Sequence, residues 1–212
     1  MHYVVSAIPL TAGFVCFAGF CWAVKSHFRK TARIPPGTYL ISVLTVIGFL
    51  WFAVRLFTDG LSTLWALALT LFIVSAALFA WTVNATRETP PTLAFDTDEP
   101  YFLLNNGPYR YVRHPFYLSY LLFWTGTALA SPGLLPWAAP FVMLLVYWTA
   151  ARREERKFAR SSLAAAYQLY RDGAGMFAPR LRSSLAAGLT RRRANGRPRK
   201  PLKKIPPSRF LP

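Results

Sequence analysis

Two short clusters of polar residues interrupt an otherwise apolar chain, and they hold the side chains best able to do chemistry. The first covers residues 107–115 (GPYRYVRHP) and the second covers residues 152–156 (RREER). Guanidinium, imidazole, phenol and carboxylate groups together can bind a ligand that carries both an anionic and a cationic group. The two clusters therefore predict a binding site for a small charged molecule.

A helix that starts at Pro115 would place two cations where an anion binds well. Proline suits the first helical position, because its missing N–H would have no partner there. Arg113 and His114 would then lie at a helix N-terminus, which favours an anion such as the carboxylate of an amino-acid-like cofactor. Glu154 and Glu155 could accept hydrogen bonds from a ribose. The set fits a zwitterionic, cationic nucleoside, for which aromatic faces are available at Tyr109, Tyr117, Tyr167 and Tyr170.

Metal ligands are not expected. His2, His27 and His114 are far apart in the sequence, and Cys16 and Cys21 lie within one apolar run. Because no group of cysteines and histidines has the spacing of metal ligands, we predict neither a metal site nor a disulfide.

A transmembrane hairpin would bring the two polar clusters together. Residues 115–150 are apolar except for a break at Ser131-Pro132-Gly133, which divides them into two helices. An antiparallel hairpin returns its last residue to the membrane face from which its first residue started. We therefore expect His114 and Glu154 to meet at one membrane surface.

The remaining pattern is that of a membrane protein. The 212 residues are 54% hydrophobic and only 16% charged. The segments 3–24, 38–57 and 61–83 each come close to the ~20 apolar residues that are needed to cross a bilayer. With the hairpin, the sequence predicts an all-α, polytopic protein with five transmembrane spans. A cytosolic helix is expected over residues 152–171, with an apolar face formed by Phe158, Leu163, Tyr167 and Tyr170.

Loop charges set the expected orientation. Lys and Arg occur in the loops 25–37 and 84–114 and after residue 150, whereas the turns at 58–60 and 131–133 have neither. Because Lys and Arg are retained on the cytoplasmic side, we expect the N-terminus outside and the C-terminus inside. The chain is expected in a bacterial cytoplasmic membrane as an integral protein.

Three regions are expected along the chain. Residues 1–104 would hold three transmembrane helices and a cytosolic loop, and residues 105–180 would form the ligand-binding core. Residues 181–212 form a tail that is rich in Arg and Lys and lacks acidic residues, in a chain of net charge +17. We expect this tail to be disordered and to contact anionic lipid headgroups, not nucleic acid.

The polar clusters and their surroundings resemble a known family. Residues 107–117, the hairpin, Glu154-Glu155, Tyr167-x-x-Tyr170 and Pro179-Arg180 are similar to the isoprenylcysteine carboxyl methyltransferases, to which membrane phospholipid methyltransferases are related. The resemblance covers roughly residues 105–181. It implies that S-adenosylmethionine binds in a pocket formed by these elements. It also implies that a methyl group passes to a lipophilic acceptor from the membrane, either an isoprenylcysteine-type carboxylate or a similar lipid.

The resemblance implies which residues would hold the cofactor. His114 and Tyr117 would bind its amino-acid end, and either Glu154 or Glu155 would bind its ribose or amine. The full set of expected cofactor-binding residues is Gly107, Tyr109, His114, Pro115, Tyr117, Glu154, Glu155, Tyr167 and Tyr170.

Catalytic roles are expected of Arg113, Arg153 and Glu155. Arg113 is the first candidate for orienting an acceptor carboxylate, and Arg153 is the second. An amine or thiol acceptor would need a base, for which Glu155 or His114 is the candidate. The chain departs from the family at two places. It has Ser119 where the family usually has Gly, and it has Leu163-Ala164 where the family has a Phe-Gly pair.

Structural interpretations of the same residues stay open. Arg113 and His114 could be interfacial anchors, and Glu154-Glu155 could form a solvated ion-pair patch. The alternative function is that of a non-enzymatic membrane protein that recruits anionic lipid or a partner through its basic tail. A small transporter is disfavoured, because the spans lack the intramembrane charges that mark ion paths.

Overall fold

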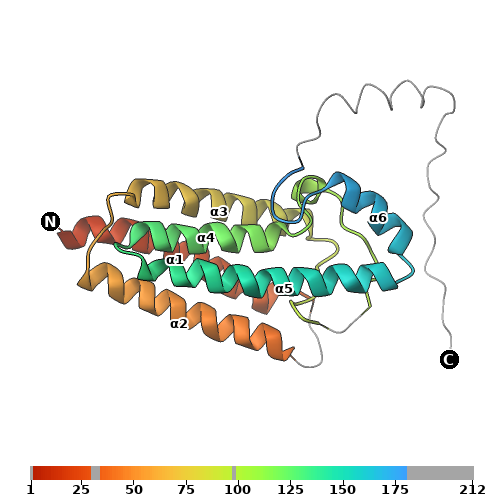
Figure 1. The fold of residues 1–212 in the computed structure, drawn as a ribbon, viewed down its shortest axis with the longest axis horizontal. Coiled ribbons are helices and arrows are strands. Elements are labelled where there is room, and N and C mark those ends of the chain that lie inside the picture. Colours follow the sequence, from red (N-terminus) through yellow and green to blue (C-terminus); the bar gives the residue numbers. More distant parts are fainter. Residues whose placement is uncertain (1, 30–33, 97–98, 181–212) are drawn as a thin grey trace, which may run out of the picture. The chain divides into compact units, whose positions relative to one another are not determined.

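The computed structural model describes residues 2–29, 34–96 and 99–180, and over these residues the chain is all-helical (Figure 1). The α-helices are α1 (His2–Ser26), α2 (Pro36–Thr58), α3 (Trp65–Ala85), α4 (Pro115–Ala130), α5 (Ala138–Arg160) and α6 (Ala164–Gly173). Short 3-10 helices, η1 (Gly107–Arg110) and η2 (Leu135–Trp137), precede α4 and α5. The predicted all-α class is confirmed. The predicted basic tail lies outside the described residues.

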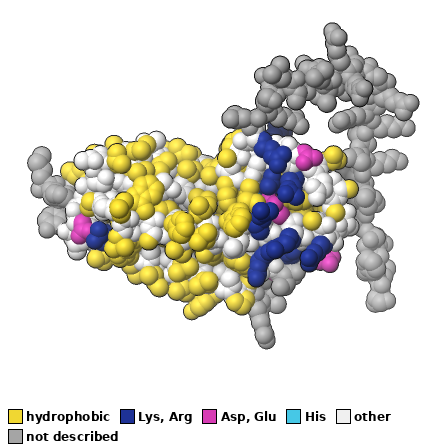
Figure 2. Space-filling model, viewed as in Figure 1, with side chains coloured by type: hydrophobic (Ala, Val, Ile, Leu, Met, Phe, Trp, Pro, Cys, Tyr) yellow, Lys and Arg dark blue, Asp and Glu magenta, His cyan; other side chains and the backbone are white. Residues whose placement is uncertain are grey.

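Three helices are long and apolar enough to cross a membrane, namely Val5–Ser26 of α1, Pro36–Thr58 and Trp65–Ala85. In the most apolar stretch of each, only 28%, 17% and 28% of the residues are buried inside the bundle. Most of their side chains therefore face outward, as contact with lipid requires. Figure 2 shows the apolar surface that these helices and their neighbours form.

The predicted hairpin is present, with α4 and α5 joined through Ser131 and η2. α4 has 16 residues. By the helical rise it is about 24 Å long, which is less than the roughly 30 Å of a bilayer's hydrocarbon core. α5 is apolar only as far as Ala151 and then becomes strongly charged. Among the described residues, three helices thus meet the length and composition of membrane spans, and the total of five stays a prediction.

The predicted continuous helix over residues 152–171 is wrong. α5 ends, the chain turns around Ser161, and α6 then begins. The Ser161 hydroxyl stabilises this turn, because it donates to the Phe158 carbonyl at 2.9 Å and accepts from the Leu163 N–H at 3.2 Å. The expected apolar face nevertheless persists across the turn, since the rings of Phe158 and Tyr167 stack with their centroids 4.8 Å apart.

α4 is the central helix of the bundle and packs along α3 (Figure 1). Ser119 of α4 is fully buried, and its carbonyl accepts a hydrogen bond from Ser75 Oγ of α3 at 2.7 Å. A small residue is needed here for the two backbones to approach, so serine meets the same requirement as the glycine of the resembling family. The packing of α4 fixes where its first residue lies, at the polar end of the bundle formed by residues 99–114 and 152–180.

Candidate functional site

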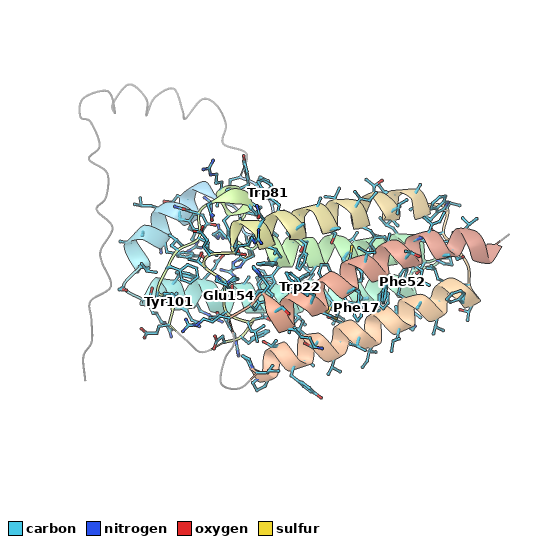
Figure 3. The ribbon with its side chains drawn as sticks, turned by 180° about the vertical axis from the view of Figure 1, so that it is seen from behind. Phe17, Trp22, Phe52, Trp81, Tyr101 and Glu154 are labelled. Carbon is cyan, nitrogen blue, oxygen red and sulfur yellow. The ribbon has the colours of Figure 1, made fainter. Side chains whose placement is uncertain are left out.

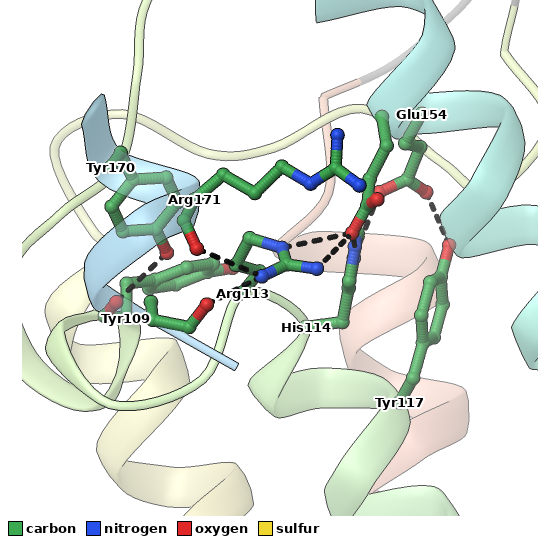
Figure 4. Close-up of polar contacts among 9 residues, drawn as sticks. Tyr109, Arg113, His114, Tyr117, Glu154, Tyr170 and Arg171 are labelled. Atoms are coloured by element: carbon green, nitrogen blue, oxygen red, sulfur yellow. Dashed lines mark hydrogen bonds and ion pairs between the residues drawn. The ribbon is translucent and has the colours of Figure 1, made fainter. Parts of the chain in front are cut away.

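The two polar clusters meet at the polar end of the bundle, as the hairpin predicted. α4 begins at Pro115, and His114 is its N-cap residue. His114 Nδ1 lies 3.4 Å from Glu154 Oε2, and His114 Nε2 lies 3.4 Å from Glu155 Oε1 (Figure 4). The start of α4 and the charged turn of α5 therefore place one imidazole between two carboxylates.

Each nitrogen of the Arg113 guanidinium has a partner within the protein itself. Its side chain is 6% exposed, and its Nε and Nη2 lie 2.9 and 2.8 Å from Glu155 Oε1. Its Nη1 donates to the carbonyl of Ala174 and, at 3.4 Å, to that of Arg171. Charge-assisted hydrogen bonds of this kind fix both partners. Arg113 therefore positions Glu155 and joins α5 to the end of α6.

A backbone contact, which the sequence analysis missed, locks the start of α4 against the segment after α6. Val112 and Gly175 form an isolated parallel bridge, in which Gly175 O accepts from Arg113 N at 2.7 Å. The N–H of His114 donates to Met176 O at 3.2 Å. A Cβ at Gly175 would lie 1.7 Å from the Ala178 carbonyl oxygen. Gly175, which follows α6, was the one sign of this contact in the sequence, because only glycine allows the backbones to approach so closely.

Tyr117 lies beside the charged cluster, one turn into α4. Its hydroxyl donates to Glu154 Oε1, and its ring stacks on the His114 ring with centroids 5.5 Å apart (Figure 4). On its other side it stacks on Tyr147 of α5, at 5.3 Å. The hydroxyl thus holds Glu154 from one side while His114 holds it from the other.

Three further tyrosines close the site from η1 and α6. The Tyr170 hydroxyl donates to the Tyr109 carbonyl at 2.8 Å. Tyr167 is 3% exposed, and its hydroxyl is buried with no hydrogen-bond partner among the described residues. Burial raises the pKa of all three phenols, so their hydroxyls stay protonated and can donate. An unpaired buried hydroxyl is unfavourable, and a bound ligand can satisfy it.

Opposite charges set the protonation of the cluster. Burial disfavours the charged form of His114, but hydrogen bonds and charges from Glu154 and Glu155 outweigh burial and raise the pKa of His114. Burial also disfavours the Glu155 carboxylate, but His114 and Arg113 outweigh burial and lower the pKa of Glu155 to about 2. With His114 protonated, two cations face two carboxylates and the cluster is neutral.

A cavity of about 200 Å³ opens beside these side chains. Its polar wall includes His114, Glu154 and Tyr167, together with Tyr109, Arg113, Tyr117 and Tyr170. Its apolar wall includes Phe28, just after α1, and Ile41 near the start of α2, and residues 91–94 and 99–104 of the loop before η1 complete the lining. Tyr101 of this loop and Glu154 are labelled at the same end of the molecule in Figure 3. The cavity therefore joins a charged region to an apolar one.

The other expected site residues lie outside the cavity wall. Gly107 has φ +51° and packs against α3, where an added Cβ would lie 2.6 Å from Ala85 Cβ. Pro115 is fully buried as the first residue of α4. Glu155 lies behind His114 and Arg113, and Arg153 lies over the ring of Phe95 with its Cζ 5.3 Å from the centroid. Cavity residues that the sequence analysis did not predict include Glu99, Tyr120, Tyr147 and Lys157.

Comparison with known proteins gives one match. A family model described as phospholipid methyltransferase matches residues 62–166, which extend from the start of α3 into α6 and contain both polar clusters. No curated protein and no solved structure matches the chain.

Proposed function

Because the chain belongs to the phospholipid methyltransferase family, which is related to the isoprenylcysteine carboxyl methyltransferases, we propose that it methylates a lipophilic acceptor with S-adenosylmethionine. The observation that carries this proposal is the cavity at the polar end. His114 and Glu154 belong to its polar wall, and its apolar wall includes residues at the ends of α1 and α2. One wall suits a charged cofactor and the other suits a lipid. We place this end on the cytoplasmic side, where loops rich in Lys and Arg are retained.

The polar wall fits the groups that S-adenosylmethionine carries. Protonated His114 suits the cofactor's carboxylate, and Glu154 suits its ammonium group or ribose hydroxyls. Glu154 is 35% exposed, so one side of its carboxylate is open to a ligand. The unpartnered Tyr167 hydroxyl supplies a further donor. These are residues of the predicted cofactor set, and each faces the cavity.

Bound S-adenosylmethionine supplies an electrophilic methyl group on a sulfonium centre. The contribution of the protein is then to bind, orient and exclude water. Tyr117 and Tyr147 both line the cavity, and their stacking fixes the positions of the two rings beside the ligand. Orientation of two reactants can contribute up to about 7–11 kcal/mol to a barrier. A carboxylate acceptor needs no proton transfer, so this arrangement is sufficient for it.

The roles of the two candidate arginines follow from their contacts. Arg113 gives its donors to Glu155, Arg171 and Ala174, so we assign it to positioning Glu155. Arg153 is exposed, so we assign it to orienting the acceptor. For an amine or thiol acceptor neither candidate base is poised to accept a proton, because the raised pKa keeps His114 protonated and the lowered pKa makes the Glu155 carboxylate a weak base.

Calorimetry with S-adenosylhomocysteine tests the proposal directly. The purified chain should bind it, and His114→Ala should weaken binding about tenfold, the value of one hydrogen bond to a charged group. Tyr167→Phe should weaken binding severalfold while leaving the unfolding temperature unchanged or higher, because it removes an unpaired buried hydroxyl. Arg152→Gln is the control, since this exposed side chain lies over the Trp148 ring. Absence of binding to the wild-type chain would refute the proposal.

A further inference from the structure

Four cations follow one another along one face of α5, on either side of the site carboxylates in the sequence. They are Arg153, Arg156, Lys157 and Arg160, and we call them the basic stripe. Their spacing of three, four and seven residues places them on the same side of the helix. Lys157 is half-buried and the three arginines are exposed. Figure 2 shows Lys and Arg side chains gathered at this end of the molecule, beside the apolar surface.

The basic stripe lines a groove of about 500 Å³, whose other wall is Phe95 and Asp96. Lys157 Nζ donates to the Asp96 carbonyl at 3.0 Å, which leaves this ammonium further N–H donors. The guanidinium of Arg153 lies over the Phe95 ring. That contact engages the face of the guanidinium, and its in-plane N–H groups stay available to an oxyanion.

The groove and the cavity adjoin. Glu154 and Lys157 are the two residues that line both spaces. Glu154 is held by Tyr117 and His114 on the cavity side, so its position is fixed. Lys157 is therefore the cation that a ligand extending from the groove into the cavity would contact.

The stripe starts at the level expected for lipid headgroups. Trp148 of α5 is 44% exposed, and the guanidinium of Arg152 lies over its ring at 5.3 Å. Exposed tryptophan beside arginine is typical of the membrane–water interface. Arg153 follows little more than one helical turn later, where phosphate and carboxylate groups of membrane lipids lie.

From these contacts we propose that the basic stripe binds the anionic group of the lipid acceptor, with Lys157 as its specificity-determining residue. This rests on the proposed function and extends it. The acceptor is then a lipid whose phosphate lies close to its methyl-accepting atom or whose carboxylate contains that atom. A phosphate lies in the groove against Arg153 and Lys157 while the accepting atom enters the cavity, whereas an acceptor carboxylate lies against Lys157, where the groove and the cavity adjoin. Arg113 is not available for this role, because its donors are bound by the protein.

Binding of short-chain lipids to the full chain in detergent micelles tests this proposal. The probes are dihexanoyl phosphatidic acid, which carries a phosphate, N-acetyl-S-farnesylcysteine, which carries a carboxylate, and uncharged dihexanoylglycerol. Lys157→Gln and Arg153→Gln should each weaken binding of an anionic probe by about fivefold or more, as expected for a lost charge-assisted contact. Binding of dihexanoylglycerol should not change.

Arg152→Gln is the matched control, because it removes a neighbouring cation outside the stripe and should leave all three affinities unchanged. Weakening confined to phosphatidic acid assigns a phosphate to the acceptor, and weakening confined to farnesylcysteine assigns a carboxylate. Equal affinities of Lys157→Gln and Arg152→Gln for both anionic probes would overturn the proposal. Titration of the same samples with S-adenosylhomocysteine reads the cofactor site separately, so loss of that binding in the wild-type chain counts only against the proposed function.

Discussion

Arg113 and His114 are adjacent in the chain, yet the site holds them in opposite ways. Both residues line the cavity, but the guanidinium of Arg113 is held by Glu155 and two backbone carbonyls, whereas the His114 ring contacts only the two carboxylates through its nitrogens among the described residues. The sequence identified both residues, but it ranked Arg113 first for acceptor binding. Only the fold shows the carbonyls of Arg171 and Ala174, because backbone acceptors leave no trace in residue types.

Removal of the Arg113 charge should destabilise the fold. Arg113→Met is expected to lower the free energy of unfolding by about 3 kcal/mol, the lower end for a broken buried pair, because His114 remains beside Glu155. Arg113→Met/Glu155→Met should recover most of this loss. Chemical denaturation in micelles, followed by circular dichroism, measures both. Arg152→Gln should change the free energy of unfolding by less than about 0.5 kcal/mol. If Arg152→Gln lowers it as much as Arg113→Met does, the result contradicts a stabilising buried pair.

His114 should make stability depend on pH. Its pKa in the folded chain is raised above the ordinary value of 6.5. Its contribution to the free energy of unfolding is therefore full below pH 6.5 and is lost as the pH rises through the folded pKa. The unfolding temperature of the wild type should therefore exceed that of His114→Asn most at low pH. The gap should narrow as the pH rises above 6.5. A gap that is constant over this range contradicts a protonated His114.

Glu155 makes stability depend on pH in the opposite direction and over a lower pH range. Its folded pKa is lowered to about 2, so its contribution is full above its ordinary pKa of 4.5 and is lost as pH falls toward 2. Both residues therefore contribute fully to stability between pH 4.5 and 6.5, where Glu155 is ionised and His114 is protonated.

Among the elements, the sequence predicted the hairpin and its consequence correctly. Apolar length and the Ser131 break indicated two antiparallel helices, and this was enough to bring His114 to Glu154. The turn between α5 and α6 was missed because the apolar spacing continues through it. Phe158 and Tyr167 stack across the turn, so a periodic pattern cannot distinguish one helix from two that share a face.

The segment after α6 should be as important as the helices. Gly175→Ala is expected to lower both the unfolding temperature and the affinity for S-adenosylhomocysteine, because its Cβ would lie 1.7 Å from the Ala178 carbonyl oxygen. A displaced segment breaks the bonds that hold Arg113 and His114, so we expect about a tenfold weaker affinity. Gly173→Ala is the matched control, because its Cβ meets nothing within 4 Å. Equal effects of the two variants contradict a role for the Val112–Gly175 bridge.

For the whole molecule, the class followed from composition, and the membrane spans followed from length. Three spans satisfy both criteria, whereas α4 is short and α5 becomes charged half-way along. The loop residues that line the cavity, 91–94 and 99–104, could not be placed from sequence, since an irregular loop has no helical or strand periodicity to read. The cavity depends on that loop, so Glu99 and its neighbours were not predicted.

The basic tail separates the proposed function from the alternative of a non-enzymatic recruiter. A chain that ends at Arg180 keeps the unit Met1–Arg180, which contains the whole site. It should bind S-adenosylhomocysteine within about twofold of the full chain, which is a difference of less than 0.5 kcal/mol. Calorimetry on both chains gives the comparison. If the shortened chain loses its function while His114→Ala keeps it, the tail carries the activity.

The bridge between Val112 and Gly175 has a consequence for biosynthesis. A nascent chain contains the three apolar helices and the hairpin before Gly175 is synthesised, because all of these elements precede it in the chain. Until then Arg113 lacks the carbonyl of Ala174, and the N–H of His114 lacks that of Met176. Chains interrupted before this point would have the apolar helices but not the segment that fixes Arg113 and His114, so translation completes the bundle before the site.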